Sequence, residues 1–145
     1  MPVTVKSITL WRKELENKTG TLAQTLEPLA KGNADLLVVM GYRHPGDEAK
    51  AAVEVYPVAS KKSVDVARQA GLAASSIPTL LVEGDNRAGL GYAIAQSIAE
   101  AHVNLAFLVA QVIGRRYSAV LGFESEADAK TAAALIKKAT AKKRK

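Results

Sequence analysis

The sequence predicts an α+β fold of two tandem ferredoxin-like βαββαβ units, with antiparallel sheets and helices on one face of each sheet. Length is the first observation behind this prediction, because 145 residues suffice for one ordinary domain or two small ones. Composition is the second, since 48% hydrophobic and 23% charged residues are typical of a globular chain. The third is an internal repeat in which strand-like and helix-like hydrophobic patterns recur in the same order.

The repeat has a constant offset of 69 residues. It aligns residues 16–36, ENKTGTLAQTLEPLAKGNADL, with residues 85–105, DNRAGLGYAIAQSIAEAHVNL, without a gap. The aligned pairs are Asn17 with Asn86, Lys18 with Arg87, Gly20 with Gly89, Leu29 with Ile98, Ala30 with Ala99 and Leu36 with Leu105. Few positions are identical, but the loop asparagine, the glycine and the apolar positions recur in the same order without a gap, which indicates two copies of one unit.

The first copy reads as strand, helix, strand, strand and helix. The helix is expected over residues 21–31, because Leu22, Leu26 and Leu29 share one face. Pro28 should kink or shorten it, and Gly32-Asn33 should end it. The other expected elements are a strand at 7–15, a loop at 17–20, strands at 36–40 and 51–58 with the turn 43–48 between them, and a helix at 60–70.

The second copy repeats this order. Leu90, Ile94 and Ile98 give its first helix an apolar face, and acidic residues at the start of its last helix suit the helix dipole. Its expected elements are a strand at 77–83, a loop at 84–89, a helix at 90–101, a buried strand at 105–113, a turn at 114–116, a strand at 117–123 and a helix at 126–138.

These elements divide the chain into four parts. They are a first repeat, residues 1–72, a small-residue linker, 73–76, a second repeat, 77–139, and a basic tail, 140–145. Each copy supplies only three strands, so each sheet needs a fourth strand. Val3–Lys6 and a strand from the other copy are both candidates, and the sequence does not choose between them.

Composition and charge exclude several classes of function. A chain without cysteine has no disulfide, thiolate metal site or cysteine nucleophile, and a reducing cytoplasm is permitted. We expect no secretory signal and no membrane span, because no apolar stretch approaches ~18 residues. Six positive charges lie in the last nine residues and account for the net charge of +6. With aromatic residues at only 5%, nucleic acid is an unexpected partner.

No catalytic constellation emerges from the sequence. The two histidines, His44 and His102, fall in turns and have no partner at metal-ligand spacing. No phosphate-binding loop or dinucleotide fingerprint occurs. We therefore expect no enzymatic activity, no metal and no cofactor.

The loop over residues 85–90, DNRAGL, carries the most chemical information. It joins a strand to a helix, so backbone N–H groups at the helix start, near Ala88, Gly89 and Leu90, favour a carboxylate. Asn86 offers both a donor and an acceptor, and Asp85 either pairs with an ammonium group or caps the helix. These groups together can hold an amino-acid zwitterion. The alternative is that Asp85 and Asn86 are only turn and capping residues.

Asn86-Arg87-Ala88-Gly89-Leu90, followed by Val103-Asn104-Leu105 at the next strand, resembles the ACT domain, a regulatory amino-acid-binding module. The resemblance covers nearly the whole chain as two tandem copies. It implies a ferredoxin-like fold that pairs with other copies, and an amino-acid site at an interface between copies. The implied ligand-binding residues are Asp85, Asn86, Arg87, Ala88, Gly89, Leu90 and Asn104 in the second copy, and Asn17, Thr19, Gly20, Thr21 and Asp35 in the first.

The sequence departs from the family pattern at several of these positions. Ala88 and Thr19 replace the loop proline, and Asp35 stands where the second copy has Asn104, which removes the amide donors. The resulting hypothesis is a non-catalytic regulatory or sensor protein that binds a small amino acid as a homodimer or homo-oligomer and acts on a regulated enzyme. The alternative is a structural protein–protein interaction module with a degenerate ligand loop.

Overall fold

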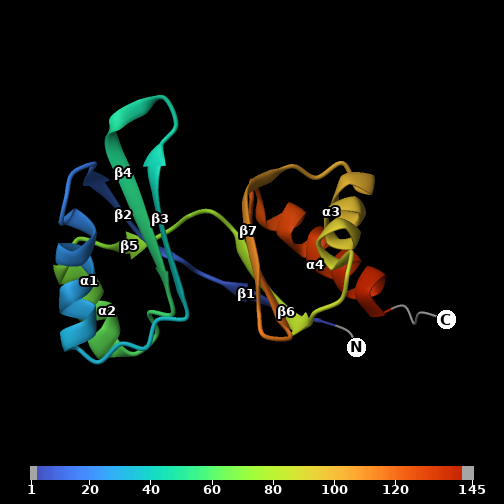
Figure 1. The fold of residues 1–145 in the computed structure, drawn as a ribbon, viewed down its shortest axis with the longest axis horizontal. Helices are drawn as coiled ribbons and strands as arrows, with labels where there is room; N and C mark the ends of the chain where they lie inside the picture. The colour runs from blue at the N-terminus through green and yellow to red at the C-terminus, as the bar shows by residue number, and fades with distance from the viewer. Residues whose placement is uncertain (1–2, 142–145) are drawn as a thin grey trace. The chain divides into compact units, whose positions relative to one another are not determined.

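The computed structural model describes residues 3–141 and divides the chain into two units (Figure 1). The N-terminal unit comprises residues 9–76. The C-terminal unit comprises residues 1–8 together with 77–145, of which 3–8 and 77–141 are described. The basic tail predicted over 140–145 lies outside the described residues from 142 onward.

The N-terminal unit is a four-stranded antiparallel sheet with two helices on one face (Figure 1). Its sheet has the order β3-β4-β2-β5. Alternation places Trp11, Val53 and Val55 on the helix side, where they pack with Leu29 and Ala67. The elements are β2 Trp11–Glu16, α1 Thr21–Lys31, β3 Val38–His44, β4 Asp47–Tyr56, α2 Lys61–Gln69 and β5 Ala73–Ala74.

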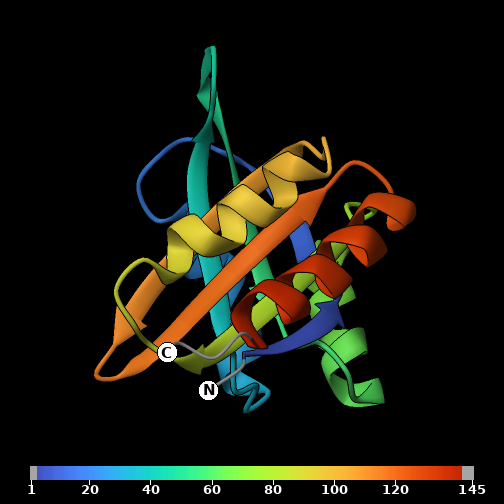
Figure 2. The ribbon, with the colours of Figure 1, turned by 90° about the vertical axis from the view of Figure 1, so that its right-hand side faces the viewer.

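The C-terminal unit has the same architecture. Its sheet order is β1-β6-β8-β7, and α3 and α4 lie together on one face, as Figure 2 shows. The core residues that these helices contribute include Leu90, Ile94, Ile98, Ala132 and Ile136. The elements are β1 Thr4–Ile8, β6 Thr79–Asp85, α3 Leu90–Glu100, β7 Leu105–Ile113, β8 Arg116–Phe123 and α4 Glu126–Ala141.

The fourth strand of each sheet comes from a different source. β1 pairs antiparallel with β6, with Val5 opposite Val82, so the N-terminus completes the C-terminal unit. β5 pairs with β2, with Trp11 opposite Ala74, and completes the N-terminal unit. The predicted continuous strand over 7–15 is therefore wrong: it is broken at Thr9 and Leu10, because its two halves join different sheets. Residues 3–8 pair outside the predicted first repeat, and the predicted linker contains a strand.

The two units share details of backbone conformation at the predicted offset. Gly20 and Gly89 have positive φ angles of 92° and 83° at the starts of α1 and α3. Asn33 and His102 have φ angles of 66° and 58° after the ends of these helices. The two-unit ferredoxin-like fold is confirmed, with left-handed residues at corresponding positions where each helix begins and ends.

Candidate functional site

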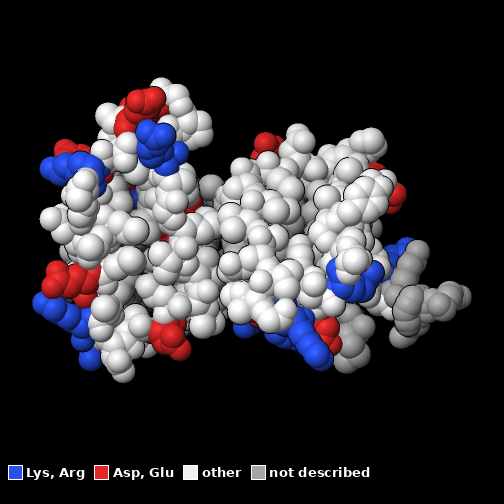
Figure 3. All heavy atoms as spheres, viewed as in Figure 1, with Lys and Arg blue, Asp and Glu red and all other residues white. Residues whose placement is uncertain are grey.

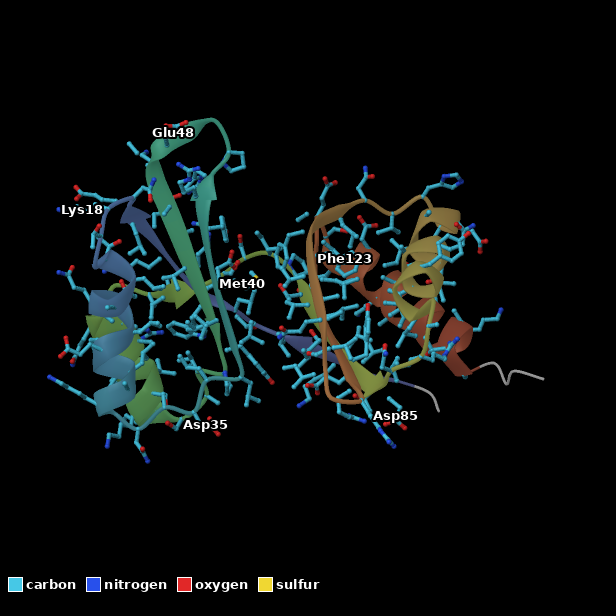
Figure 4. All side chains as sticks on the ribbon, viewed as in Figure 1. Lys18, Asp35, Met40, Glu48, Asp85 and Phe123 are labelled. Atoms are coloured by element: carbon cyan, nitrogen blue, oxygen red, sulfur yellow. The ribbon has the colours of Figure 1, made fainter. Side chains whose placement is uncertain are left out.

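The loop between β2 and α1 is tied to the neighbouring β3–β4 hairpin. The backbone N–H of Asn17 donates to the Ala49 carbonyl at 2.9 Å, and its side-chain Nδ2 donates to the Glu48 carbonyl at 2.6 Å. The hydroxyl of Thr21 donates to the carbonyls of Glu16 and Lys18, each at 3.0 Å. Figure 4 shows Lys18 and Glu48 near the same end of the N-terminal unit. These bonds give the loop a defined shape, although most of its residues are exposed.

A pocket of about 270 Å³ adjoins this loop, close to the lower end of the ~300–1,000 Å³ range of small-molecule sites. Its floor is a row of residues on three adjacent strands, since Leu15 pairs with Ala51 and Ala51 pairs with Arg43. The lining residues are Leu15, Asn17, Lys18, Gly20, Thr21, Leu22, Gly41, Tyr42, Arg43, Ala51 and Ala52. Asn17, Gly20 and Thr21 from the predicted first-copy site therefore lie together at a cavity.

Two small residues keep this pocket open. Ala51 presents only a methyl group in the centre of the row, between Leu15 and Arg43. Gly41 lies two residues before Arg43 on β3, on the same face of the sheet, and a Cβ atom added there would meet no atom within 4 Å. The space is bounded by apolar side chains, by the Asn17 amide and by the first turn of α1.

The corresponding loop of the C-terminal unit has the same backbone course. The N–H of Asn86 donates to the Arg115 carbonyl at 2.8 Å, as that of Asn17 donates to Ala49. Gly89 begins α3 without a side-chain capping bond, so the alternative of Asp85 as the helix cap is not realised. Asp85 instead pairs with Arg116, with 3.1 Å between Oδ1 and the guanidinium. Residues 85–89 are all exposed.

Tyr117 fills the place in the C-terminal unit that Ala51 leaves open in the N-terminal unit. Gly84 is the repeat equivalent of Leu15, and it pairs with Tyr117 as Leu15 pairs with Ala51. Tyr117 is only 6% exposed, and its hydroxyl would lie 3.7 Å from a Cβ atom added to Gly91 in the first turn of α3. Burial raises the pKa of the Tyr117 hydroxyl. Tyr117 pairs in turn with Val112, which stands where the N-terminal unit has Arg43. This row therefore has no counterpart of Arg43.

Asp35 and Asn104 do not lie at the loops of their own units. Each follows the helix that starts at the loop, and α1 with its 11 residues spans about 16 Å. Figure 4 shows Asp35 near the opposite end of the N-terminal unit from Lys18. Within one unit, these residues are separated from the loop by the length of the helix.

A network of polar and charged side chains lies on the sheet face opposite the helices of the N-terminal unit. Glu54 is 1% exposed, and its Oε2 accepts a hydrogen bond of 2.5 Å from the Tyr42 hydroxyl and lies 3.8 Å from Arg12 Nε. Burial and the bond to Glu54 raise the pKa of Tyr42. His44 Nε2 lies 3.3 Å from Glu14 Oε2. His44, predicted as a surface turn residue, is the half-buried end of β3.

Several other kinds of site find no support in the described residues. Within residues 3–141, no group of three His, Asp or Glu side chains could hold a metal ion. No helix in that range is long and apolar enough to span a membrane. Figure 3 shows charges of both signs together at the tip of the β3–β4 hairpin, and no stripe of one sign on that face.

Arg43, Ala51 and Gly41 were absent from the sequence-predicted site. They lie on β3 and β4, more than 20 residues from the loop, and no local motif marks them. Aligning the two hairpins by strand pairing would have brought out the contrast between Ala51 and Tyr117. The pairing register needed for that alignment comes from the structure.

Solved structures share this fold over nearly the whole chain. A protein of Bacteroides thetaiotaomicron is similar with a TM-score of 0.69 at 15% identity, over 92% of this chain and 98% of that one. The regulatory subunit of aspartate kinase from Thermus thermophilus is similar with a TM-score of 0.61 at 12% identity, over 96% and 97%. Aspartate kinase from Clostridium acetobutylicum matches over 95% of this chain and 34% of that one, with a TM-score of 0.59 at 11% identity.

No protein-family model and no curated protein sequence matches the chain. At these identities the structural likeness establishes the fold, and it confirms the two-unit ferredoxin-like fold that the sequence predicts. The chain is thus a tandem pair of ferredoxin-like units, with a fold similar to that of the regulatory subunit of aspartate kinase from Thermus thermophilus.

Proposed function

We propose that the protein is a non-catalytic cytoplasmic regulatory protein that binds a small amino acid in the pocket of the N-terminal unit. The observation that carries this proposal is the cavity of about 270 Å³ beside residues 17–21. The similarity to the regulatory subunit of aspartate kinase supports a regulatory role. Tyr117 occupies the equivalent space in the C-terminal unit, so one ligand per chain is proposed.

The pocket offers partners for both charged groups of an amino acid. Gln24 is the first residue of α1 whose N–H bonds back along the helix, to the Gly20 carbonyl. The N–H groups of Leu22 and Ala23 precede it, and at a helix N-terminus they favour a carboxylate. Because Asn17 Nδ2 is engaged by the Glu48 carbonyl, its Oδ1 atom is the acceptor left for an ammonium group.

Calorimetric titration with each of the twenty amino acids tests this proposal. We expect one of them to bind with a stoichiometry of one per chain and to raise the melting temperature. Asn17→Ala should weaken binding by about tenfold or more, because a hydrogen bond to a charged group is lost. Ala51→Tyr should abolish binding, because the new ring would fill the pocket as Tyr117 fills the equivalent space in the C-terminal unit.

Asn86→Ala is the matched control, since it alters the equivalent loop beside the filled space and should leave affinity unchanged. Trp11 fluorescence checks that the variants of the N-terminal unit are folded, because Trp11 lies in its core. If no amino acid binds at millimolar concentration, the ligand proposal fails and a structural interaction module with a degenerate loop takes its place. Equal losses from Asn17→Ala and Asn86→Ala would contradict the assignment to one unit.

We further propose that the chain forms a homodimer through β7, and that ligand binding shifts the association of this dimer with a regulated enzyme. β7 is an edge strand, and its nine residues include no charged side chain. Leu108, Val109, Val112 and Ile113 on it are between 43% and 68% exposed. Edge strands of monomers usually carry charges or other features that prevent pairing, so an uncharged apolar edge favours pairing with a second copy.

Analytical ultracentrifugation of the full chain tests the dimer. We expect a dimer that Val109→Lys converts to a monomer, because like charges would face each other across the paired strands. Gln111→Lys on the same strand should weaken the dimer similarly, whereas Lys130→Gln on α4 should leave it intact. A monomer at all concentrations would overturn this part of the proposal.

A further inference from the structure

We propose that the N-terminal pocket selects an amino acid with an acidic side chain, and that Arg43 binds the side-chain carboxylate. This inference rests on the proposed function and names the class of ligand for the same site. It starts from the charges that line the pocket. The lining contains two cationic side chains, Lys18 and Arg43, and no acidic side chain.

The two cations are not equivalent. Lys18 Nζ lies 3.0 Å from Glu16 Oε1, so an acidic neighbour already balances its charge. Arg43 makes no ion pair with any residue in the described range 3–141. The pocket therefore carries one uncompensated positive charge, in addition to the positive end of α1. A ligand with a net charge of −1 complements these charges better than a neutral or cationic amino acid.

Arg43 lies where it can reach a second carboxylate. It belongs to the row that runs from Leu15 through Ala51, so the short Ala51 side chain leaves space between it and the loop. Gly41, two residues earlier on β3, adds open space beside it. A guanidinium forms two parallel hydrogen bonds with the two oxygen atoms of a carboxylate. A ligand with a side-chain amide is neutral there and offers only one acceptor oxygen, so it binds a guanidinium less well.

The equivalent row of the C-terminal unit lacks all of these features. Tyr117 fills its centre, and Val112 stands at the position of Arg43. The arginine and the open space thus occur together in one unit, and neither occurs at that row in the other. This joint occurrence supports a binding role for Arg43 over that of a solvated surface residue.

Paired ligands of nearly equal size test the inference. Calorimetric titration at low salt would compare L-aspartate with L-asparagine and L-glutamate with L-glutamine. We expect one of the acids to bind at least about tenfold more tightly than its amide, and this ratio should fall as salt is added. Arg43→Gln should bring the ratio close to one, and Arg43→Lys should retain part of it.

Arg115→Gln is the matched control, because Arg115 is an exposed arginine in the turn of the β7–β8 hairpin of the other unit. It should leave the ratio unchanged. If an amide or another neutral amino acid binds as tightly as the acids, or if Arg43→Gln leaves the ratio intact, this inference is overturned while the proposed function stands. If none of the twenty amino acids binds, both fail together.

Discussion

The close contact between Phe107 and Gly122 allows a sharp test of packing in the C-terminal unit. The two residues pair across β7 and β8. A Cβ atom on Gly122 would lie 2.2 Å from Phe107 Cε2, whereas ordinary contacts begin at 3.4 Å. The phenyl ring covers the space that a side chain at residue 122 would occupy, an arrangement in which an aromatic residue shields a strand glycine.

Gly122→Ala should therefore destabilise the protein. The ring must move by roughly 1.2 Å to restore a 3.4 Å contact, or rotate away from the sheet. Overpacking of this kind costs about 1–3 kcal/mol, and each kcal/mol lowers the melting temperature of a unit this small by about 4–8 °C. Gly41→Ala is the matched control, because a Cβ atom at residue 41 meets nothing within 4 Å and should cost almost nothing.

Urea unfolding followed by far-UV circular dichroism measures the free energies. Trp11 fluorescence, which comes from the single tryptophan, separately follows the N-terminal unit. In a Phe107→Leu background, Gly122→Ala should become nearly neutral, because the ring that it strikes is gone. An unchanged midpoint for Gly122→Ala, or an equal loss in both backgrounds, would refute this account of the contact.

Other substitutions probe the loops, the buried polar network and the core. Gly20→Ala and Gly89→Ala should each lower the free energy of unfolding by about 1–2 kcal/mol, because both positions have positive φ angles; urea titration measures this, and equal losses would agree with the repeat. Tyr42→Phe should cost about 1–3 kcal/mol at neutral pH, because buried Glu54 loses a hydrogen bond. Burial and Glu54 raise the pKa of Tyr42 in the folded state, so the wild type should lose stability as pH rises above about 10, where the unfolded chain releases its proton. A series of unfolding measurements at increasing pH should show that Tyr42→Phe loses less stability above about pH 10 than the wild type does. Leu29→Ala should cost about 2–5 kcal/mol by leaving a cavity in the N-terminal core, and a loss below 1 kcal/mol by Trp11 fluorescence would contradict its buried position.

The local elements and their repetition were determined by the sequence. α1 covers residues 21–31 and β7 covers residues 105–113, as the sequence predicts. The prediction that residues 105–113 form a buried strand is wrong, because β7 is an edge strand and most of its residues are exposed. The glycines at 20 and 89 mark equivalent helix starts, since only a residue that tolerates positive φ suits them. α1 continues past Pro28 to Lys31, and the N–H of Gly32 donates to the Pro28 carbonyl at 3.0 Å.

Strand partners and the pocket were decided only by the tertiary structure. The alternation over residues 7–15 predicts which side chains face a core, but it does not predict which sheet the strand joins. The chain passes from one sheet to the other at Thr9 and Leu10. The contrast between Ala51 and Tyr117 likewise depends on which strand residues stand opposite each other. Both features are long-range pairings, and local propensity carries no information about residues that are distant in the chain.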